Sequence, residues 1–385
     1  MNKENLLFIC GNIMPYSSQG VRYNNLLSEL KKYYNITLIS YNFFYFDKDI
    51  QIITISKLSA SVNNNIHNSK TTKGVIKYLY KKFLRYFVFP DKYKYILRKY
   101  RKEIDYLFKK DDFKKVIIGM TPFSLYQLAP YLRKNYNVEI TCDLSDPFSF
   151  NSDNDYSFIY NKNYIYKYEK KYLNYIHKVV VLNPSIQKLY IEQFKNTKVF
   201  VIEQGINKIQ RCLLKSKKRN SNIRLIYAGG LYKNFREAFE LYKAIDSFNG
   251  LFQLNIFGNI KKELLPHSEN CSYQGAISWE LLVKEYQKSD CIVFIDNNKG
   301  YQVPGKILEI QETGKPILFI YSNPKSPTFY YLFNENIIRV KNDEFEILDG
   351  MRKIQTIIGY SEKSERLKDY SWFNLGIKYK ELLND

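Results

Sequence analysis

Short apolar runs alternate with amphipathic stretches along the first half of the chain. Each apolar run has the length of a buried strand, and the amphipathic stretches, such as 21–34, repeat with the period of a helix. An alternation of strand and helix predicts a mostly parallel sheet covered by helices on both faces. The strand candidates are 6–10, 36–40, 116–118, 138–142, 179–182 and 199–202.

The pattern lapses in the polar, basic stretch 208–222 and then restarts. A second set of apolar runs, with helical patterns between them, predicts a second doubly wound domain, and 385 residues suit two domains. The tail, 361–383, is amphipathic and helical, with Trp372 as its large anchor. We therefore expect an N-terminal domain at 1–207, completed by 361–385, and a C-terminal domain at 208–360. The second set of runs is 223–228, 252–257, 291–295 and 316–320.

Doubly wound sheets bind ligands outside the carboxyl ends of their strands. Two such domains placed face to face would hold a ligand in the cleft between them. Candidate chemistry is therefore sought in the loops that follow the predicted strands.

The composition indicates where in the cell the protein is expected and what kind of partner it would attract. No apolar stretch approaches the roughly 18 residues of a membrane-spanning helix, and the N-terminus lacks the layout of a signal peptide. The five cysteines are scattered without a CxxC pair, so we expect reduced, structural thiols in the cytosol. The net charge of +21 predicts attraction to an anionic partner, although a codon bias toward lysine would explain part of the excess.

The excess charge peaks in segment 70–115, which holds 16 Lys and Arg against 5 acidic residues. Within it, residues 75–89 alternate aromatic and cationic side chains as interfacial helices do. This predicts a peripheral protein at the inner face of a membrane with anionic lipids. The alternative is a surface helix whose aromatic side lies in the core, and no nucleic-acid motif accompanies the charge.

Residues 302–318 carry the strongest local motif. Pro304 suits the first turn of a helix, Glu309 falls one turn into it, and Gly314 ends it before a strand. A helix that begins where a ligand is expected offers free N–H groups to a diphosphate. Glu309 or Glu312, one turn into this helix, would reach the ribose hydroxyls. A capped helix with solvated glutamates is the alternative.

This segment resembles the PxKxxE…GxP signature of family-four, group-one glycosyltransferases, through Pro304, Lys306, Glu309, Gly314 and Pro316. The resemblance implies a GT-B fold of two Rossmann-like domains. It also implies that Glu309 holds the donor ribose while the helix start holds the diphosphate, which assigns Val303, Pro304, Gly305 and Lys306 to donor binding. The family's E-x7-E pair is broken, because its first position is Tyr301.

Further segments match the same family in the same order. Residues 227–233 resemble the strand and glycine turn that open the donor domain, with Gly229 and Gly230 in the turn. The basic residues that grip the diphosphate would be Lys233 and Arg236, and a solvated basic turn is the alternative. Gly258 matches a glycine near the nucleotide base. Residues 273–290 and 201–207 resemble two more family segments.

In the N-terminal half, the loop 11–20 lacks the GxGxxG spacing of dinucleotide sites. Gly20 matches the family glycine that lies near the donor, and Arg22 is a candidate for an anionic acceptor or a plain surface arginine. Asp143 and Asp146 follow a predicted strand and are similar to the family's D.rDlwp segment. We assign Asp143 to acceptor binding and Asp146 to orienting or deprotonating the acceptor hydroxyl, with turn capping as the alternative.

No metal site is predicted. Asp153 and Asp155 spell the DxD of the metal-dependent glycosyltransferase architecture, but they lie in a polar stretch of a chain that lacks that architecture. The three histidines, His67, His177 and His267, have no metal-ligand spacing.

Together these features predict a bacterial, metal-independent, hexosyltransferase-like enzyme that needs no cofactor. Its donor would be a nucleotide diphosphate sugar, expected to be a UDP-sugar, and its acceptor a cell-surface glycan or lipid-linked glycan. The resemblance implies retention, with Lys233 and Arg236 answering the charge on the leaving phosphate. A catalytically silent subunit that binds a glycan or a partner transferase, suggested by Tyr301, and a nucleotide-sugar epimerase remain as alternatives.

Overall fold

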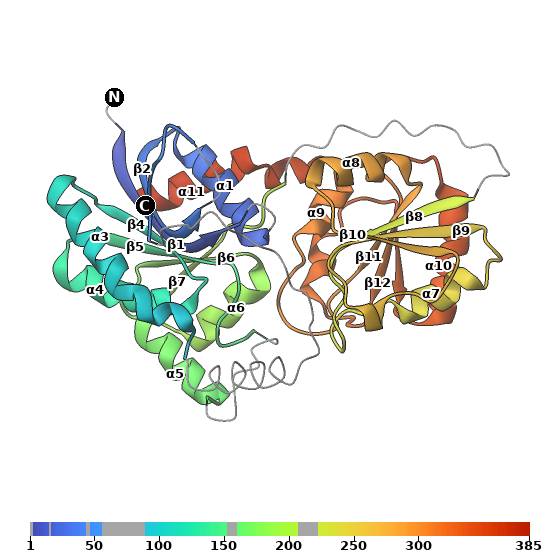
Figure 1. The fold of residues 1–385 in the computed structure, drawn as a ribbon, viewed down its shortest axis with the longest axis horizontal. Coiled ribbons are helices and arrows are strands. Elements are labelled where there is room, and N and C mark those ends of the chain that lie inside the picture. Colours follow the sequence, from blue (N-terminus) through green and yellow to red (C-terminus); the bar gives the residue numbers. More distant parts are fainter. Residues whose placement is uncertain (1–2, 15–16, 44–46, 56–88, 152–159, 207–221) are drawn as a thin grey trace, which may run out of the picture. The chain divides into compact units, whose positions relative to one another are not determined.

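The computed structural model describes the chain except residues 1–2, 15–16, 44–46, 56–88, 152–159 and 207–221. The chain divides into two units, Met1–Glu203 with Leu375–Asp385, and Gln204–Asn374. The structure therefore places residues 361–374 in the second unit, whereas the sequence assigned the whole tail to the first. Each unit is built on one sheet (Figure 1).

The first unit has a seven-stranded sheet in the order β3-β2-β1-β4-β5-β6-β7. Every neighbouring pair is parallel, so all carboxyl ends meet at one edge. The strands are β1 (Glu4–Ile13), β2 (Tyr34–Phe43), β3 (Gln51–Thr54), β4 (Lys115–Gly119), β5 (Glu139–Leu144), β6 (Lys178–Val181) and β7 (Lys198–Val201).

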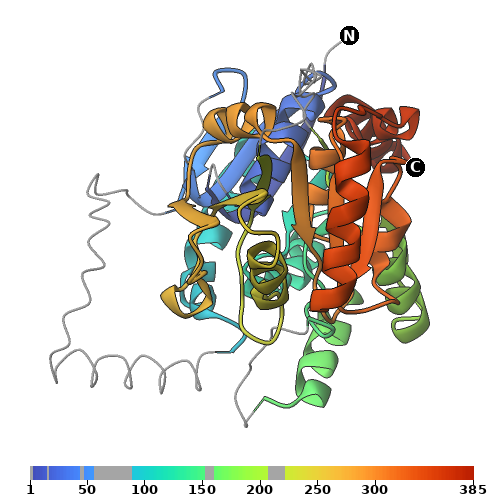
Figure 2. The ribbon, with the colours of Figure 1, turned by 90° about the vertical axis from the view of Figure 1, so that its right-hand side faces the viewer.

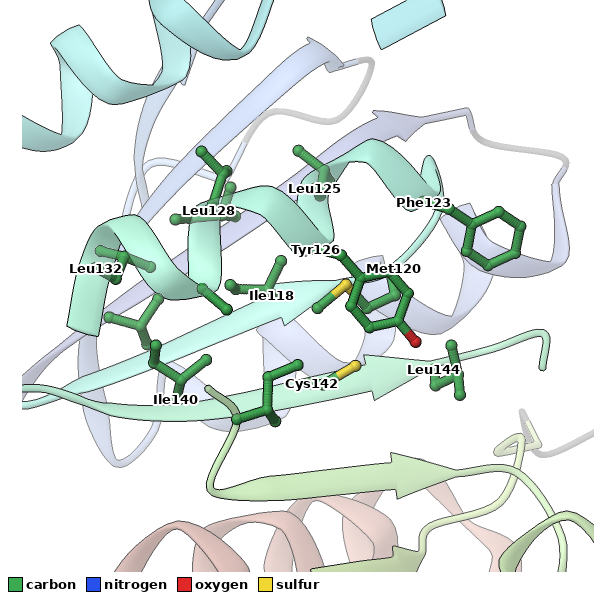
Figure 3. Close-up of a cluster of buried hydrophobic side chains, with 14 of the residues drawn as sticks. Ile118, Met120, Phe123, Leu125, Tyr126, Leu128, Leu132, Ile140, Cys142 and Leu144 are labelled. Atoms are coloured by element: carbon green, nitrogen blue, oxygen red, sulfur yellow. The ribbon is translucent and has the colours of Figure 1, made fainter. Parts of the chain in front are cut away.

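Helices cover both faces of this sheet. One face packs against α3 (Leu97–Lys110), α4 (Leu128–Asn135), α5 (Lys162–Leu173), α6 (Pro184–Gln193) and the short helices η1 (Lys92–Ile96) and η2 (Phe123–Gln127). Figure 3 shows how Ile118, Ile140 and Leu132 interdigitate in that core. The other helices of this unit are α1 (Ser18–Leu30) and α11 (Trp372–Asn384).

The second unit has a six-stranded parallel sheet in the order β10-β9-β8-β11-β12-β13. Helices α7 and α10 share a buried core on one face, and α8 and α9 share the core on the other (Figure 2). Among the helices described in either unit, none is long and apolar enough to cross a membrane.

The strands of the second unit are β8 (Ile223–Ala228), β9 (Phe252–Phe257), β10 (Cys271–Gly275), β11 (Cys291–Ile295), β12 (Ile317–Tyr321) and β13 (Ile337–Lys341). The helices are α7 (Phe239–Asp246), η3 (Lys262–Leu264), α8 (Trp279–Lys288), α9 (Lys306–Gln311), η4 (Pro327–Tyr331), α10 (Glu344–Ile357) and η5 (Glu365–Tyr370).

The ten strands expected from apolar runs all form, within a few residues of the predicted ends. Three further strands, β3, β10 and β13, were missed, and all three lie at an edge of a sheet. An edge strand buries fewer of its residues, and β10 keeps only Cys271 fully buried. Its polar sequence therefore gives no apolar run.

The helix α11 is tied to the first sheet by a buried polar network. Arg22 on α1 and Asp143 on β5 form an ion pair with Nη2 and Oδ2 2.8 Å apart, at 1% and 0% exposure. Tyr379 on α11 donates to Asp143 Oδ2 at 3.1 Å, and Arg22 donates to the carbonyls of Ile202 and Glu203. The pair thus joins α1, β5, the end of β7 and α11.

This network predicts a large asymmetry between single and double substitutions. Arg22→Met should lower the free energy of unfolding of the first unit by about 3–5 kcal/mol, because it leaves the Asp143 carboxylate buried without its cation. Arg22→Met combined with Asp143→Leu should lose less than Arg22→Met alone. Native-state hydrogen exchange of the amides in the first sheet measures this. Arg98→Met, on the exposed side of α3, is the control, and an equal loss in Arg22→Met and Arg98→Met would contradict the account.

Candidate functional site

The strand order of the second sheet reverses between β8 and β11. From β8 the chain proceeds outward to β9 and β10, and from β11 it proceeds the opposite way to β12 and β13. The connections after β8 and after β11 therefore leave in opposite directions, and the carboxyl ends of two such strands are where doubly wound sheets bind their ligands. The donor-site residues predicted in this half fall in the segments that follow β8, β9 and β11.

Glycines let the main chain of neighbouring strands converge there. Gly258 follows β9 with a φ of +139°, and a Cβ on it would lie 2.1 Å from the carbonyl oxygen of Gly229. The N–H of Gly229 in turn donates to the carbonyl of Phe257 at 2.9 Å. Gly258 is therefore required by the approach of two backbones, and its predicted contact with a nucleotide base stays a prediction.

The loop after β8 is a tight turn that carries both predicted cations. Tyr232 and Arg236 exchange main-chain hydrogen bonds of 2.8 Å in each direction, and Asn234 takes the left-handed conformation between them, with a φ of 60°. Lys233 lies at the exposed tip and makes no hydrogen bond or ion pair with any residue that the structure describes. Arg236 is half-buried at the base of the turn.

Arg236 is held by neutral groups. Its Nη2 donates to Asn297 Oδ1, and its Nη1 lies 3.5 Å from the carbonyl oxygen of Gly230. Its Nε has no partner among the described residues, and no described carboxylate forms an ion pair with it. No ion pair with a described carboxylate therefore offsets the charge of the guanidinium, and its buried Nε–H is left without a partner.

Lys306 brings a second cation to the carboxyl end of β8. It opens α9, and its Nζ donates to the carbonyl of Ala228 at the end of β8, 3.2 Å away. Burial lowers the pKa of Lys306, the Glu309 carboxylate partly offsets this, and the charge of Arg236 lowers it further. The two cations are thus close enough to repel each other. A bound anion would relieve this repulsion.

The helix that begins at Lys306 is short. α9 spans only six residues, and Pro304 precedes it, with its carbonyl accepting from the N–H of Ile307 at 3.1 Å. Val303, Pro304 and Gly305 are half-buried in the segment that leads into the helix. Gly314 ends this helical segment in the left-handed conformation, as predicted, with a φ of +70°. We therefore attribute the positive potential at this edge mainly to the side chains of Arg236 and Lys306 and less to the dipole of this short helix.

Glu309 and Glu312 lie in different environments although they are one turn apart. Glu312 is buried and forms an ion pair in which its Oε2 lies 2.5 Å from Lys363 Nζ. Glu309 is half-buried, and burial raises its pKa from 4.5 to about 7, with the cation of Lys306 lowering it in part. Of the two glutamates, Glu309 is therefore the one that remains available to a ligand.

Asp296 and Asn297 were missed by the sequence analysis. Both are buried directly after β11, and burial raises the pKa of Asp296, whose Oδ1 accepts from Thr328 at 2.8 Å. Asn297 bonds to the guanidinium of Arg236. The signal that was available was the polar triplet 296–298, which interrupts an apolar strand at its carboxyl end.

The first unit corrects two assignments. Arg22 and Asp143, predicted to bind an acceptor, are fully buried and bonded to each other, so neither offers a surface to a substrate. Gly20 is required by packing, because a Cβ on it would lie 1.8 Å from the carbonyl oxygen of Met14. Asp146 lies half-buried two residues beyond β5, at the carboxyl edge of the sheet.

The remaining predicted residues add no further ligand-binding group among the residues that the structure describes. His177 accepts from the N–H of Ile140 at 2.8 Å, and burial lowers its pKa. Within the described residues, no group of three or more His, Cys, Asp or Glu side chains is placed to hold a metal ion. Asp153, Asp155, His67 and most of the basic aromatic stretch 75–89 lie outside the described residues.

Comparison with known proteins identifies the fold. No family model matches the chain, and no curated protein matches it. Solved structures do match over nearly the full length. Sucrose-phosphate synthase from Thermosynechococcus elongatus has a TM-score of 0.70 at 12% identity, with 99% of this chain and 98% of that chain covered.

Two further structures agree with this match. A glycosyltransferase from Rickettsia africae has a TM-score of 0.61 at 15% identity, with 100% and 98% of the two chains covered. HepE from Anabaena, solved with UDP and glucose, has a TM-score of 0.63 at 10% identity, with 99% of both chains covered. With its two parallel, doubly wound sheets, the chain has the GT-B fold that the sequence predicted.

The raised pKa of Glu309 predicts a pH-dependent loss of stability. The folded state retains the proton between pH 4.5 and about pH 7 while the unfolded chain loses it, so stability falls as the pH rises through this window. Glu309→Gln should therefore be more stable than the native protein by about 1–3 kcal/mol at pH 8 and equal to it at pH 4. Thermal melting at both pH values measures this, with the exposed Glu269→Gln as control. A difference between native protein and Glu309→Gln that does not change with pH would contradict it.

Proposed function

We propose that this GT-B chain transfers a sugar from a nucleotide diphosphate sugar to an acceptor hydroxyl. The observation that carries the proposal is the pair of cations, Arg236 and Lys306, at the carboxyl ends of β8 and β11, where no described carboxylate pairs with Arg236. Doubly wound sheets bind their ligands at this point, and a diphosphate is the anionic part of such a donor.

A UDP-sugar is the donor class that we propose. HepE was solved with UDP and glucose, and a structure described as trehalose-6-phosphate from E. coli contains UDP-2-fluoro glucose. The second of these has a TM-score of 0.59 at 10% identity, with 99% of both chains covered. These ligands belong to those proteins, and they guide the choice of the first nucleotide to test here.

The proposed roles follow from the positions of the side chains. Arg236 and the exposed Lys233 stabilise the charge that grows on the terminal phosphate as the sugar leaves, which is the largest electrostatic demand of the reaction. Lys306 supports the same field. Glu309 accepts hydrogen bonds from the ribose hydroxyls, and Gly229 and Gly230 allow the backbone close to the diphosphate.

We propose transfer with retention by attack on the face from which the phosphate leaves. The bond between the anomeric carbon and the phosphate oxygen breaks, and its electron pair stays on that oxygen. The acceptor oxygen bonds to the anomeric carbon, and its proton passes to the departing phosphate. Asp146 is proposed to orient the acceptor hydroxyl. The cations are side chains, so we propose that neither a metal ion nor another cofactor takes part.

A catalytically silent subunit is the second candidate. Tyr301 stands where the resembling family has the first glutamate of its pair, and the structure places its ring at the surface, 42% exposed. A silent subunit would bind a nucleotide or a glycan without releasing the nucleoside diphosphate. Incubation with nucleotide sugars, with and without acceptor, separates the two functions.

Arg236→Ala tests the donor site. It should weaken binding of a nucleoside diphosphate by about 10- to 100-fold, because a charged hydrogen bond contributes about 1.5–3 kcal/mol. Binding of the matching nucleotide sugar should fall less, since its terminal phosphate carries one charge fewer, and release of nucleoside diphosphate should slow by at least the same factor as the diphosphate affinity. Calorimetry and a product assay measure these quantities.

The control for this test is Arg224→Ala, at the other end of the same strand, where the arginine lies beside Asp290. This variant should behave as the native protein does. Equal nucleotide affinity in Arg236→Ala and the native protein would overturn the donor assignment.

The membrane partner is a separate proposal, and described residues support it. The exposed residues of η1, α3 and α5 and of the turn after α5 are all cations, tyrosines or asparagines, and we call the cations and tyrosines among them the basic face. Interfacial tyrosines among lysines suit anionic headgroups. We propose that it holds the enzyme at the inner face of a bacterial membrane, with a glycan or lipid-linked acceptor. The basic face consists of Lys92, Tyr95, Arg98, Lys99, Lys102, Tyr106, Lys109, Lys110, Lys162, Tyr164, Lys167, Lys170, Lys171 and Tyr175.

Substitution of Lys99, Lys102 and Lys109 by glutamine should reduce partitioning onto anionic vesicles at least tenfold, because each cation near the bilayer contributes about 1 kcal/mol. Binding of the native protein should also weaken as salt is raised. Vesicle sedimentation measures both effects. The matched control replaces three exposed lysines of the second unit, Lys261, Lys262 and Lys284. Equal losses in the two triple variants would show that net charge alone, and not the basic face, drives binding.

A further inference from the structure

The side chain of Asn297 connects the loop after β8 to the segment before α9. Its Oδ1 accepts from Arg236 Nη2, and its Nδ2 donates to the carbonyl of Gln302 at 3.1 Å. Asn297 is 6% exposed, so these bonds are shielded from solvent. One amide therefore links the guanidinium that follows β8 to the segment that leads into α9 and Lys306.

Asn298 holds the main chain of the same loop. Its N–H donates to the carbonyl of Phe235 at 3.0 Å, and its Nδ2 donates to the carbonyl of Asn234 at 2.8 Å. Two neighbouring asparagines thus hold the loop after β8. Asn298 secures its backbone, and Asn297 secures the side chain of Arg236.

The chemistry of the amide is suited to this task. An amide oxygen accepts a hydrogen bond from a guanidinium without neutralising it, whereas a carboxylate would form an ion pair and cancel much of the field. Arg236 Nε is buried without a hydrogen-bond partner among the described residues, so the protein groups alone do not satisfy every N–H of the guanidinium. A preoriented cation also loses less conformational freedom when an anion binds.

We propose that Asn297 is a positioning residue, which holds Arg236 in place for a diphosphate while leaving its charge intact. This inference rests on the proposed donor site. It makes Asn297 a determinant of diphosphate affinity, although its amide is already engaged by protein groups. The competing explanation is that Asn297 only stabilises the turn after β11.

The test uses the full chain and two ligands. The first is the nucleoside diphosphate, among UDP, GDP, CDP and ADP, that the native protein binds most tightly, and the second is the corresponding nucleoside. Asn297→Asp should weaken diphosphate binding at least tenfold and leave nucleoside binding within twofold. Asn297→Ala should weaken diphosphate binding less, and Asn297→Ser, which restores a neutral acceptor, should recover part of the loss. Asn255→Asp on β9 is the charge-matched control and should bind as the native protein does.

The dependence on Arg236 distinguishes positioning from stability. In the Arg236→Ala background, the neutral substitution Asn297→Ala should change diphosphate affinity by less than twofold, because the group that Asn297 positions is gone. A loss that is equal in both backgrounds, or equal for diphosphate and nucleoside, would overturn the inference. Native protein that binds none of the four diphosphates would overturn the proposed function and this inference together. Tight diphosphate binding that is unaffected by Asn297→Asp would overturn the inference alone.

Discussion

The reversal of strand order between β8 and β11 is the constraint on which the proposed site depends. Parallel strands put every carboxyl end at one edge, and the reversal sends the loops after these two strands in opposite directions. Arg236 and Lys306 occupy this position, and an anionic ligand would be attracted to both of them.

The neighbouring polar groups preserve that field. Arg236 is anchored by an amide and a carbonyl, and the nearby carboxyls, Glu309 and Asp296, have pKa values that burial raises. Near neutral pH the Glu309 carboxyl is held partly neutral, so it subtracts less from the local positive potential than a fully ionised carboxylate would. In the first unit the situation is the reverse, because Arg22 and Asp143 neutralise each other and join α1 and α11 to the sheet. Burial and pairing thus separate a structural arginine from a candidate functional one.

The sequence predicted most of the fold, because central strands of a parallel sheet are buried on both faces and read as apolar runs. It missed β10, whose polar residues occupy an edge, and it assigned residues 361–374 to the wrong unit. The resemblance to the family pointed to Arg236, Lys306 and Glu309, whose role as donor-site residues stays a prediction. Spacing did not reveal that Arg22 and Asp143 meet across 121 positions, or that Asn297 bonds to Arg236 across 61. Such pairings depend on tertiary register, which local pattern does not encode.

The central claim is that the switch point of the second sheet binds a diphosphate. A crystal structure of the protein with its tightest-binding nucleoside diphosphate tests this most directly. The account predicts phosphate oxygens within about 3 Å of the guanidinium of Arg236. It also predicts the ribose hydroxyls on the carboxyl group of Glu309. A nucleotide bound at the carboxyl edge of the first sheet, with Arg236 still bonded only to Asn297 and Gly230, would contradict it.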